Sequence, residues 1–219
     1  RRPTVALGYS GLNGAAGFRS SWLGPDADPA ALRIYQGQDA AAAVVVDGSL
    51  EAAVQLERFS GLKFDGDFPA EPLQWCLESV GLGWQDVTVI GHNFDFTGLG
   101  PMISATPLGK ALYAGVYAPE IQSALVRSAL PDLPKSLGVT PVAHHYAHGL
   151  FRAIASRFNE AAVLVVDGMG ESQSTSIYRF SDGALRRVFT LGPRGSLGLW
   201  YSLVTAHLGF LPNTDEYKV

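Results

Sequence analysis

Paired cysteines and long apolar runs are both missing from this sequence of 219 residues. Its single cysteine, Cys76, excludes an intramolecular disulfide and is typical of a reducing compartment. No apolar run approaches the roughly 20 residues that a membrane-spanning helix requires. The formal net charge of −4 is too small to indicate nucleic acid or an anionic membrane surface as a partner. We therefore expect a soluble, cytoplasmic protein.

Several common catalytic motifs are also missing. The sequence contains no GxxxxGK[ST] segment, no GxSxG segment and no CxxC pair. P-loop nucleotidases, α/β-hydrolases and thiol oxidoreductases depend on these motifs, so the sequence gives those three classes no support.

What is present is a repeated pattern of strands and helices. Hydrophobic residues form 47% of the chain, which is enough for a sizeable core. Two sets of three strands with tight turns are separated by helical segments, and this order predicts an α/β protein with two similar lobes in succession. The strands are expected at residues 4–9, 41–46 and 50–57, and again at 161–166, 174–180 and 184–191.

We expect the first lobe to span residues 1–160, with a long loop at 10–38, and the second lobe to begin at residue 161. A helix is expected at 196–208. The second lobe lacks the later strands of the first, so we expect the sequence to be a fragment of a longer protein.

The stretch Val142–Glu171 concentrates the residues that favour chemistry. Three of the five histidines of the chain lie here, at His144, His145 and His148. In a helix that begins near His144, His144 and His148 stand one turn apart on one face. Such a pair suits a divalent metal. The alternative is that one histidine caps the helix, one packs and one is solvated, and the spacing supports both interpretations equally.

A carboxylate and two glycines follow the next apolar strand, in Asp167-Gly168-Met169-Gly170-Glu171. Asp167 can complete a metal site with the histidine pair. Gly168 and Gly170 can let backbone amides approach a phosphate. The simpler interpretation is a tight hairpin turn in which Glu171 is solvated.

Two further segments offer weaker candidates. Arg194 and its glycine neighbours precede Ser196, where a helix begins, and a helix N-terminus beside an arginine can bind an anion. A plain serine N-cap explains Ser196 slightly better. Asp39, before the second strand, either lines a cleft or is an ordinary loop residue.

Taken together, these segments resemble the O-carbamoyltransferase family, which includes nodulation protein U and the tobramycin, cephamycin, ansamycin and macrolide carbamoyltransferases. No single segment is decisive, but their order and spacing make the match strong. The matching segments are 38–59 (QDAAAAVVVDGSLEAAVQLERF), 67–69 (DFP), 144–149 (HHYAHG), 161–171 (AAVLVVDGMGE) and 216–219 (EYKV).

The resemblance implies a fold and an activity. Family members have an actin-like (ribonuclease H-like) two-lobed domain, similar to the tRNA threonylcarbamoyl transferase, and a C-terminal domain expected beyond residue 219. That second domain converts ATP and carbamoyl phosphate into carbamoyl adenylate, and the first moves the carbamoyl group to a hydroxyl. The long loop resembles members that act on macrolide, ansamycin or alkaloid acceptors. The resemblance is also compatible with a homo-oligomer.

The resemblance also implies site residues. It assigns a divalent metal to His144, His148 and Asp167, with Fe²⁺ as in the family and Mg²⁺ or Zn²⁺ as alternatives. The expected nucleotide- and phosphate-binding residues are Gly168, Gly170, Glu171, Arg194 and Lys218. His145 is expected to point away or to contact substrate.

One position departs from the family. Members usually have His-Asp before the second strand, where this chain has Gln38-Asp39, and that histidine is the family's general base. Glutamine cannot accept a proton at neutral pH. Three explanations remain: an engineered inactive variant, which we favour, a natural change with the base elsewhere, or lost activity.

Two other functions stay open. An actin-like sugar kinase or phosphotransferase shares the fold but uses carboxylates and Mg²⁺, and the histidine pair argues against it. A non-catalytic ligand-binding relative is the other alternative, and Gln38 is the feature that supports it.

Overall fold

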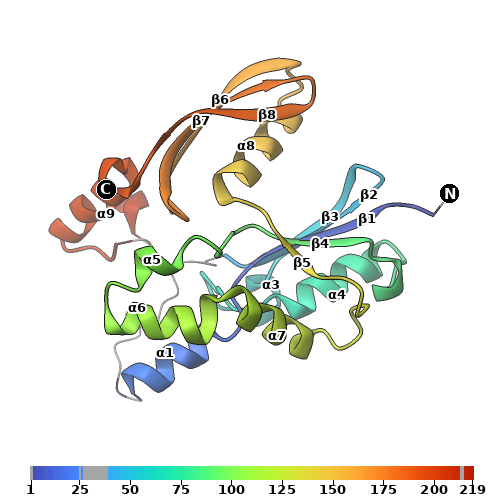
Figure 1. Cartoon of the computed structure of the whole chain (residues 1–219), viewed down its shortest axis with the longest axis horizontal. Helices are drawn as coiled ribbons and strands as arrows, with labels where there is room; N and C mark the ends of the chain where they lie inside the picture. Colours follow the sequence, from blue (N-terminus) through green and yellow to red (C-terminus); the bar gives the residue numbers. More distant parts are fainter. Residues whose placement is uncertain (1, 25, 27–38, 213–214) are drawn as a thin grey trace. The chain divides into compact units, whose positions relative to one another are not determined.

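The computed structural model describes residues 2–24, 26, 39–212 and 215–219 (Figure 1). The chain divides into two compact units, Arg1–Pro141 and Val142–Val219. Within the described residues, no helix has both the length and the apolar character needed to cross a membrane. Each unit is built around its own sheet.

The first unit contains a five-stranded mixed sheet in the order β3-β2-β1-β4-β5. The strand β1 lies antiparallel to β2, and β2 antiparallel to β3, while β1, β4 and β5 are mutually parallel. This order and direction are those of the ribonuclease H-like fold. The strands are β1 (Val5–Ser10), β2 (Ala41–Val46), β3 (Ser49–Gln55), β4 (Val89–His92) and β5 (Val139–Pro141).

Tight turns and prolines divide the helices of this unit. A two-residue turn at Asp47 and Gly48, both with positive φ, joins β2 to β3. Pro119 begins α7 at a position where its missing amide hydrogen costs nothing. The helices are α1 (Ala15–Leu23), α3 (Glu57–Ser60), α4 (Ala70–Ser79), α5 (Gly100–Ile103), α6 (Pro107–Leu112), the π-helical η2 (Tyr113–Tyr117) and α7 (Pro119–Ala129), with a 3₁₀ turn, η1 (Trp84–Asp86).

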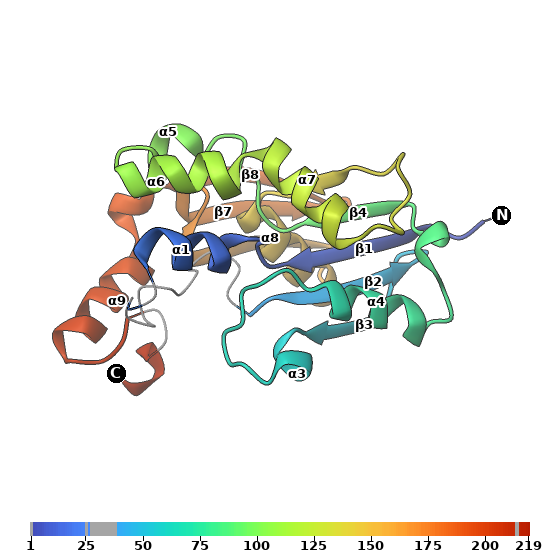
Figure 2. The ribbon, with the colours of Figure 1, turned by 90° about the horizontal axis from the view of Figure 1, so that it is seen from below.

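One face of the five-stranded sheet forms the main core. Alternate residues of β1 (Val5, Leu7 and Tyr9) are buried on that face, as the two-residue period of a strand requires. Figure 2 shows α4 and α7 lying over the sheet, and both helices contribute apolar side chains to the same core. Leu77 of α4 is completely buried in it.

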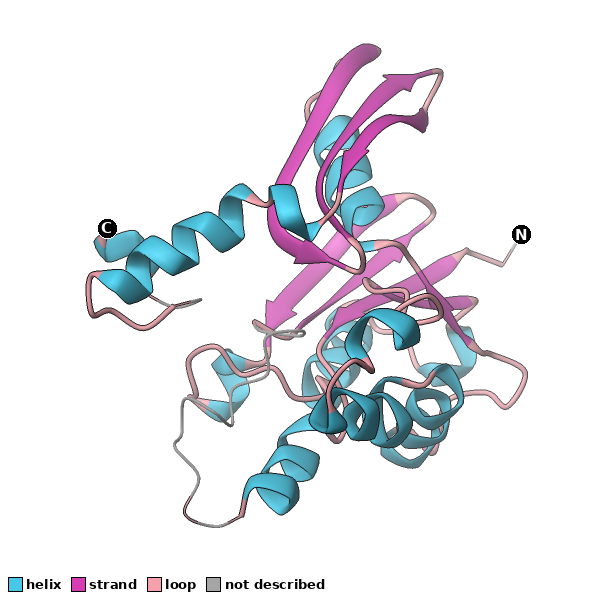
Figure 3. Cartoon of the chain, turned by 60° about the vertical axis from the view of Figure 1, so that its left-hand side comes forward, coloured by secondary structure: helices cyan, strands magenta, loops and turns pink. Residues whose placement is uncertain are grey.

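The second unit is a three-stranded antiparallel meander with α8 (His144–Ala155) on one side, as Figure 3 shows. The helix crosses all three strands closely at Gly149. A Cβ there would lie 3.2 Å from Leu185, 3.5 Å from Tyr178 and 3.6 Å from Val163. The other elements are β6 (Glu160–Gly170), β7 (Gln173–Ser181), β8 (Ala184–Leu191), η3 (Pro193–Gly195), α9 (Leu197–His207) and η4 (Glu216–Lys218).

The α/β class is confirmed, and both sets of three antiparallel strands form. Two details differ from expectation. The third strand ends at Gln55 rather than Glu57, which instead begins the short helix α3. The lobe division expected near residue 160 assigned the histidine helix to the first lobe, whereas α8 packs on the second sheet.

We predict that Leu77→Ala lowers the free energy of unfolding by about 2–5 kcal/mol, because it leaves a cavity in the main core. The matched control is Leu62→Ala, since Leu62 is 64% exposed, and its effect should stay within about 0.5 kcal/mol. Urea denaturation measures both. Equal losses for the two variants would contradict the assigned core.

Candidate metal centre

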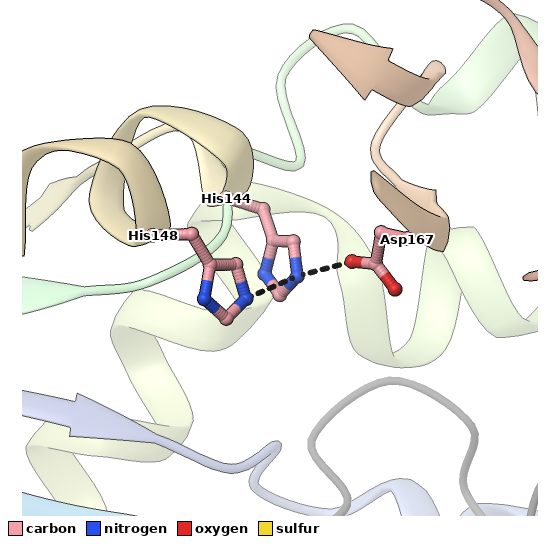
Figure 4. A group of neighbouring side chains, drawn as sticks. All are labelled: His144, His148 and Asp167. Atoms are coloured by element: carbon pink, nitrogen blue, oxygen red, sulfur yellow. Dashed lines mark hydrogen bonds and ion pairs between the residues drawn. The ribbon is translucent and has the colours of Figure 1, made fainter. Parts of the chain in front are cut away.

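Three potential metal ligands come together in the second unit. His144 and His148 lie one turn apart near the start of α8, and Asp167 lies in β6 (Figure 4). The Nε2 atom of His144 is 2.8 Å from Oδ2 of Asp167 and 3.1 Å from Nε2 of His148. One ligand atom from each residue lies within 4.8 Å of the others. The structure thus assembles the three residues that the sequence singled out.

These contacts are difficult to satisfy with hydrogen atoms alone. The Nε2 atom of a neutral histidine either donates one proton or accepts one. If His144 donates to Asp167, its Nε2 cannot accept a proton from His148. If it instead accepts a proton from His148, no proton lies between its Nε2 and the carboxylate of Asp167, so two acceptors face each other. A cation held by all three groups removes this conflict, so the donor set fits a metal.

The distances between the donor atoms fit the same interpretation. Neighbouring ligands of an octahedral cation with bonds of about 2.1 Å are separated by roughly 3.0 Å. The two measured contacts, 2.8 and 3.1 Å, bracket that separation. Two imidazoles and one carboxylate suit Fe²⁺ or Zn²⁺ and leave coordination positions for other ligands.

Proton equilibria in the cluster also favour metal binding. The hydrogen bond from His144 lowers the pKa of Asp167 to about 2, against an opposing effect of burial. Burial lowers the pKa of His148, and the neighbouring His144 lowers it further. Metal ligands must be deprotonated to bind. Asp167 and His148 are therefore in the binding form at neutral pH.

Glu171 orients the first histidine. Its Oε1 atom accepts a hydrogen bond of 2.8 Å from the backbone N–H of His144. A carboxylate at this place caps the N-terminus of α8 and complements the helix dipole. The sequence suggested a ligand or a solvated turn residue for Glu171, and the structure gives it this capping contact.

Gly170 allows α8 and β6 to approach each other. A Cβ atom at residue 170 would lie 2.6 Å from Cδ2 of His144 and 2.8 Å from Cδ2 of His145. Real side chains do not tolerate such contacts. Only glycine at this place lets the imidazole of His144 lie beside β6.

Asp167 projects from an irregular part of β6. Val166 pairs with Thr175 and Gly170 pairs with Gln173, so the three intervening residues of β6 stand opposite Ser174 alone. The tight hairpin turn suggested for Asp167-Gly168 is therefore wrong, because the strand continues to Gly170. A bulge of this kind turns a side chain away from its regular direction.

The start of α9 holds this bulge in place. The hydroxyl of Ser196 lies 3.1 Å from the carbonyl oxygen of Asp167 and 2.7 Å from that of Gly168. It also accepts a hydrogen bond from the backbone N–H of Leu199, so the expected serine N-cap is confirmed. A Cβ at Gly198 would lie 2.6 Å from Gly168, so α9 touches the bulge backbone to backbone.

His145 has a different environment from its neighbours. It is completely buried, and its Nδ1 lies 2.8 Å from the hydroxyl of Ser176 on β7. Burial lowers its pKa. His145 thus points into the contact between α8 and the sheet, away from the metal ligands, which agrees with the first of its two predicted roles.

The remaining predicted residues lie outside the cluster. Arg194 is exposed in η3. Lys218 pairs with Asp215 at 2.9 Å. Asp39 is exposed with a φ of 56°, and partial burial, together with Glu57, raises its pKa. Gln38 lies outside the described residues.

Sequence reasoning missed two contributors to this site. Ser176 supports His145, and Gly198 lets α9 reach the bulge. Ser176 alternates with the buried aromatic residues Tyr178 and Phe180 of β7, and this two-residue period was a usable signal that its hydroxyl faces inward. Nothing local marks Gly198, because its importance depends on a contact with Gly168, distant in sequence.

Comparisons with known proteins show the family to which this region is similar. The family model described as carbamoyltransferase N-terminus matches residues 106–219, which include all three candidate ligands. The chain is 32% identical to an uncharacterized protein, sll1178, of Synechocystis sp., over 83% of this chain and 32% of that protein. It is 28% identical to nodulation protein NolNO of Sinorhizobium fredii, over 83% of this chain and 27% of that protein.

The chain therefore spans about a third of the length of these curated relatives. Among solved structures, YeaZ from Pseudomonas aeruginosa is similar with a TM-score of 0.41 and 12% identity, over 87% of this chain and 68% of that one.

We predict that Gly170→Ala destabilises the protein by about 1–3 kcal/mol, because its methyl group overlaps His144 and His145. Gly168→Ala is the matched control in the same strand, since a Cβ there has no neighbour within 4 Å, and it should change stability by less than about 1 kcal/mol. Chemical denaturation of both variants provides the measurement. A Gly170→Ala variant as stable as the control would contradict the close packing described.

Proposed function

The chain belongs to the carbamoyltransferase family, matching the N-terminal part of its members, and on this premise we propose that it takes part in O-carbamoyl transfer. In this reaction, ATP and carbamoyl phosphate supply carbamoyl adenylate, and the carbamoyl group moves to a hydroxyl of a small-molecule natural product. A macrolide, ansamycin or alkaloid is the proposed acceptor class. The observation that carries the proposal is the His144–His148–Asp167 cluster inside the matched region.

The transfer step has a simple balance of atoms. The acceptor oxygen forms a bond to the carbamoyl carbon, the bond from that carbon to the adenylate phosphate oxygen breaks, and AMP leaves. The acceptor proton passes to a general base. The family resemblance assigns the formation of carbamoyl adenylate to a different domain from the one described here.

His144, His148 and Asp167 would hold the divalent metal, with Fe²⁺ favoured by resemblance. Such an ion supplies Lewis acidity, which polarises a carbonyl or phosphoryl oxygen. The protein supports this set of ligands in two ways. Glu171 fixes the backbone of His144 through its hydrogen bond of 2.8 Å. Ser196 anchors the bulge from which Asp167 projects.

Gln38 and Asp39 take the place of the family's His-Asp pair. Asp39 keeps the carboxylate of that pair, and its raised pKa brings it closer to the range of a general base. A glutamine, as at position 38, cannot accept a proton at neutral pH. This one residue favours a second candidate function, a ligand-binding relative that has lost transfer activity.

Removal of one ligand tests the metal assignment. We predict that His148→Ala weakens the binding of Fe²⁺ or Zn²⁺ by about 100-fold or more and abolishes carbamoyl transfer with it, since loss of even an outer-shell partner costs 10–100-fold. Equilibrium dialysis with metal analysis measures the first effect. His207→Ala, at an exposed site on α9, should leave both unchanged. Stoichiometric metal and full activity in His148→Ala would refute the assignment.

Restoring the histidine tests the role of position 38. We predict that Gln38→His raises the rate of transfer from carbamoyl adenylate by about 10²–10⁴-fold, the usual contribution of a general base. The control is Gln36→His, which adds the same side chain two positions earlier and should have no effect. No gain in Gln38→His would favour the ligand-binding alternative over an inactivated transferase.

A further inference from the structure

The first unit carries a surface groove that shares no residue with the metal cluster. The groove is bounded by α3, α4, the 3₁₀ turn η1 and the chain that follows α7, and its volume is about 540 Å³. All of its lining residues belong to the first unit, whereas the three candidate metal ligands belong to the second. The role of this groove is therefore independent of the proposed carbamoyl transfer.

Exposed aromatic rings form much of the surface of the groove. Trp75 on α4 is 41% exposed and Phe59 on α3 is 39% exposed, and both line the groove. Trp84 lines it as well, while it also packs against the main core. Large apolar rings gathered at one surface groove are typical of a place where a partner binds. Tryptophan in particular is enriched among the residues that supply most of the binding energy of an interface.

The charged groups around these rings are all acidic. Glu71, Glu78 and Asp132 line the groove, and within the described residues no lysine, arginine or histidine does. None of the three carboxylates forms an ion pair with a residue that the structure describes. A partner that carries positive charge complements such a surface.

Hydrogen bonds hold the walls of the groove in position. The indole N–H of Trp84 donates to Oε1 of Gln74 at 2.6 Å, and the amide nitrogen of Gln74 donates to Oε1 of Glu78, also at 2.6 Å. In the chain after α7, the guanidinium of Arg127 donates to four carbonyl oxygens between residues 133 and 137. Groups that are already fixed lose little conformational freedom when a ligand binds.

The residues of α4 that line the groove form one stripe along the helix. Glu71, Gln74, Trp75 and Glu78 stand at i, i+3, i+4 and i+7, which is the spacing of a single helical face. With a rise of about 1.5 Å per residue, Glu78 lies about 10 Å along the helix axis from Glu71. In a polyproline II chain, which rises about 3.1 Å per residue, residues i and i+3 lie on one side about 9 Å apart. Two basic side chains at those positions match the two carboxylates.

We propose that this groove binds a basic, proline-containing segment of a partner protein in the polyproline II conformation. Arginines three positions apart pair with Glu71 and Glu78, and the prolines between them pack on Trp75. Proline-rich segments suit aromatic grooves because their conformation is formed before binding. Arginine is favoured over lysine because its planar guanidinium also stacks on aromatic rings.

The probe is the peptide acetyl-Arg-Pro-Pro-Arg-amide, titrated into the full chain and followed by NMR. We expect localised shifts in the indole N–H signals of Trp75 and Trp84. A peptide with citrulline, an uncharged isostere, in place of both arginines should bind about tenfold more weakly, because two exposed ion pairs are lost. The peptide acetyl-Arg-Arg-Pro-Pro-amide keeps the charge but not the spacing, and it should bind about threefold more weakly, because one pair is lost.

Substitutions on the surface of the chain test the rings and the carboxylates separately. Trp75→Ala should weaken probe binding about tenfold or more. Its matched control is Trp22→Ala, at a tryptophan on α1 that is 49% exposed and does not line the groove. Glu71→Gln should weaken probe binding about two- to fivefold. Its matched control is Glu51→Gln, at an exposed position on β3 outside the groove. Both controls should bind the probe as the unaltered chain does.

Several results would overturn the proposal. One is the absence of localised shifts, or full affinity for the probe in Trp75→Ala. Another is a citrulline peptide that binds as tightly as the probe, because charge would then play no part. If arginine amide alone binds as tightly as the probe, the groove takes a single small cation instead of a peptide. If the Trp75 and Trp84 signals shift with protein concentration in the absence of peptide, the occupant is a second copy of the chain.

Discussion

The close approach of α8 to β6 at Gly170 is the contact on which the candidate metal centre depends. Because residue 170 has no side chain, the ring of His144 can lie against the strand and reach Asp167. In this position the backbone N–H of His144 donates to Glu171, which caps the helix. A larger residue would separate the helix from the strand and the imidazoles from the carboxylate. The arrangement of the three candidate ligands therefore depends on the packing of the α8 backbone against β6.

Local patterns in the sequence predicted much of this molecule. The apolar runs located the strands, and the i, i+4 spacing of His144 and His148 placed them on one face of a helix that does form. The structure brings Asp167 close to both histidines, but in a different way from the one that the sequence predicts. Asp167 was expected at the end of a strand, whereas a bulge inside the strand aims its side chain.

What the sequence could not predict depends on contacts between distant residues. The unit boundary follows from α8 packing on the sheet that comes after it, and strand periodicity says nothing about that choice. The contact of Gly198 with Gly168 is likewise a property of the folded chain. Periodicity predicts which face is buried, but not which distant residues meet there.

The hydrogen bond between His144 and Glu171 joins residues only 27 positions apart in the sequence. The whole ligand set is therefore enclosed by one short loop of chain, made of one helix and the strand that follows it. Closing a short loop costs little chain entropy, and contacts of low sequence separation form early in folding. We therefore expect this helix and strand to come together before the rest of the sheet is complete.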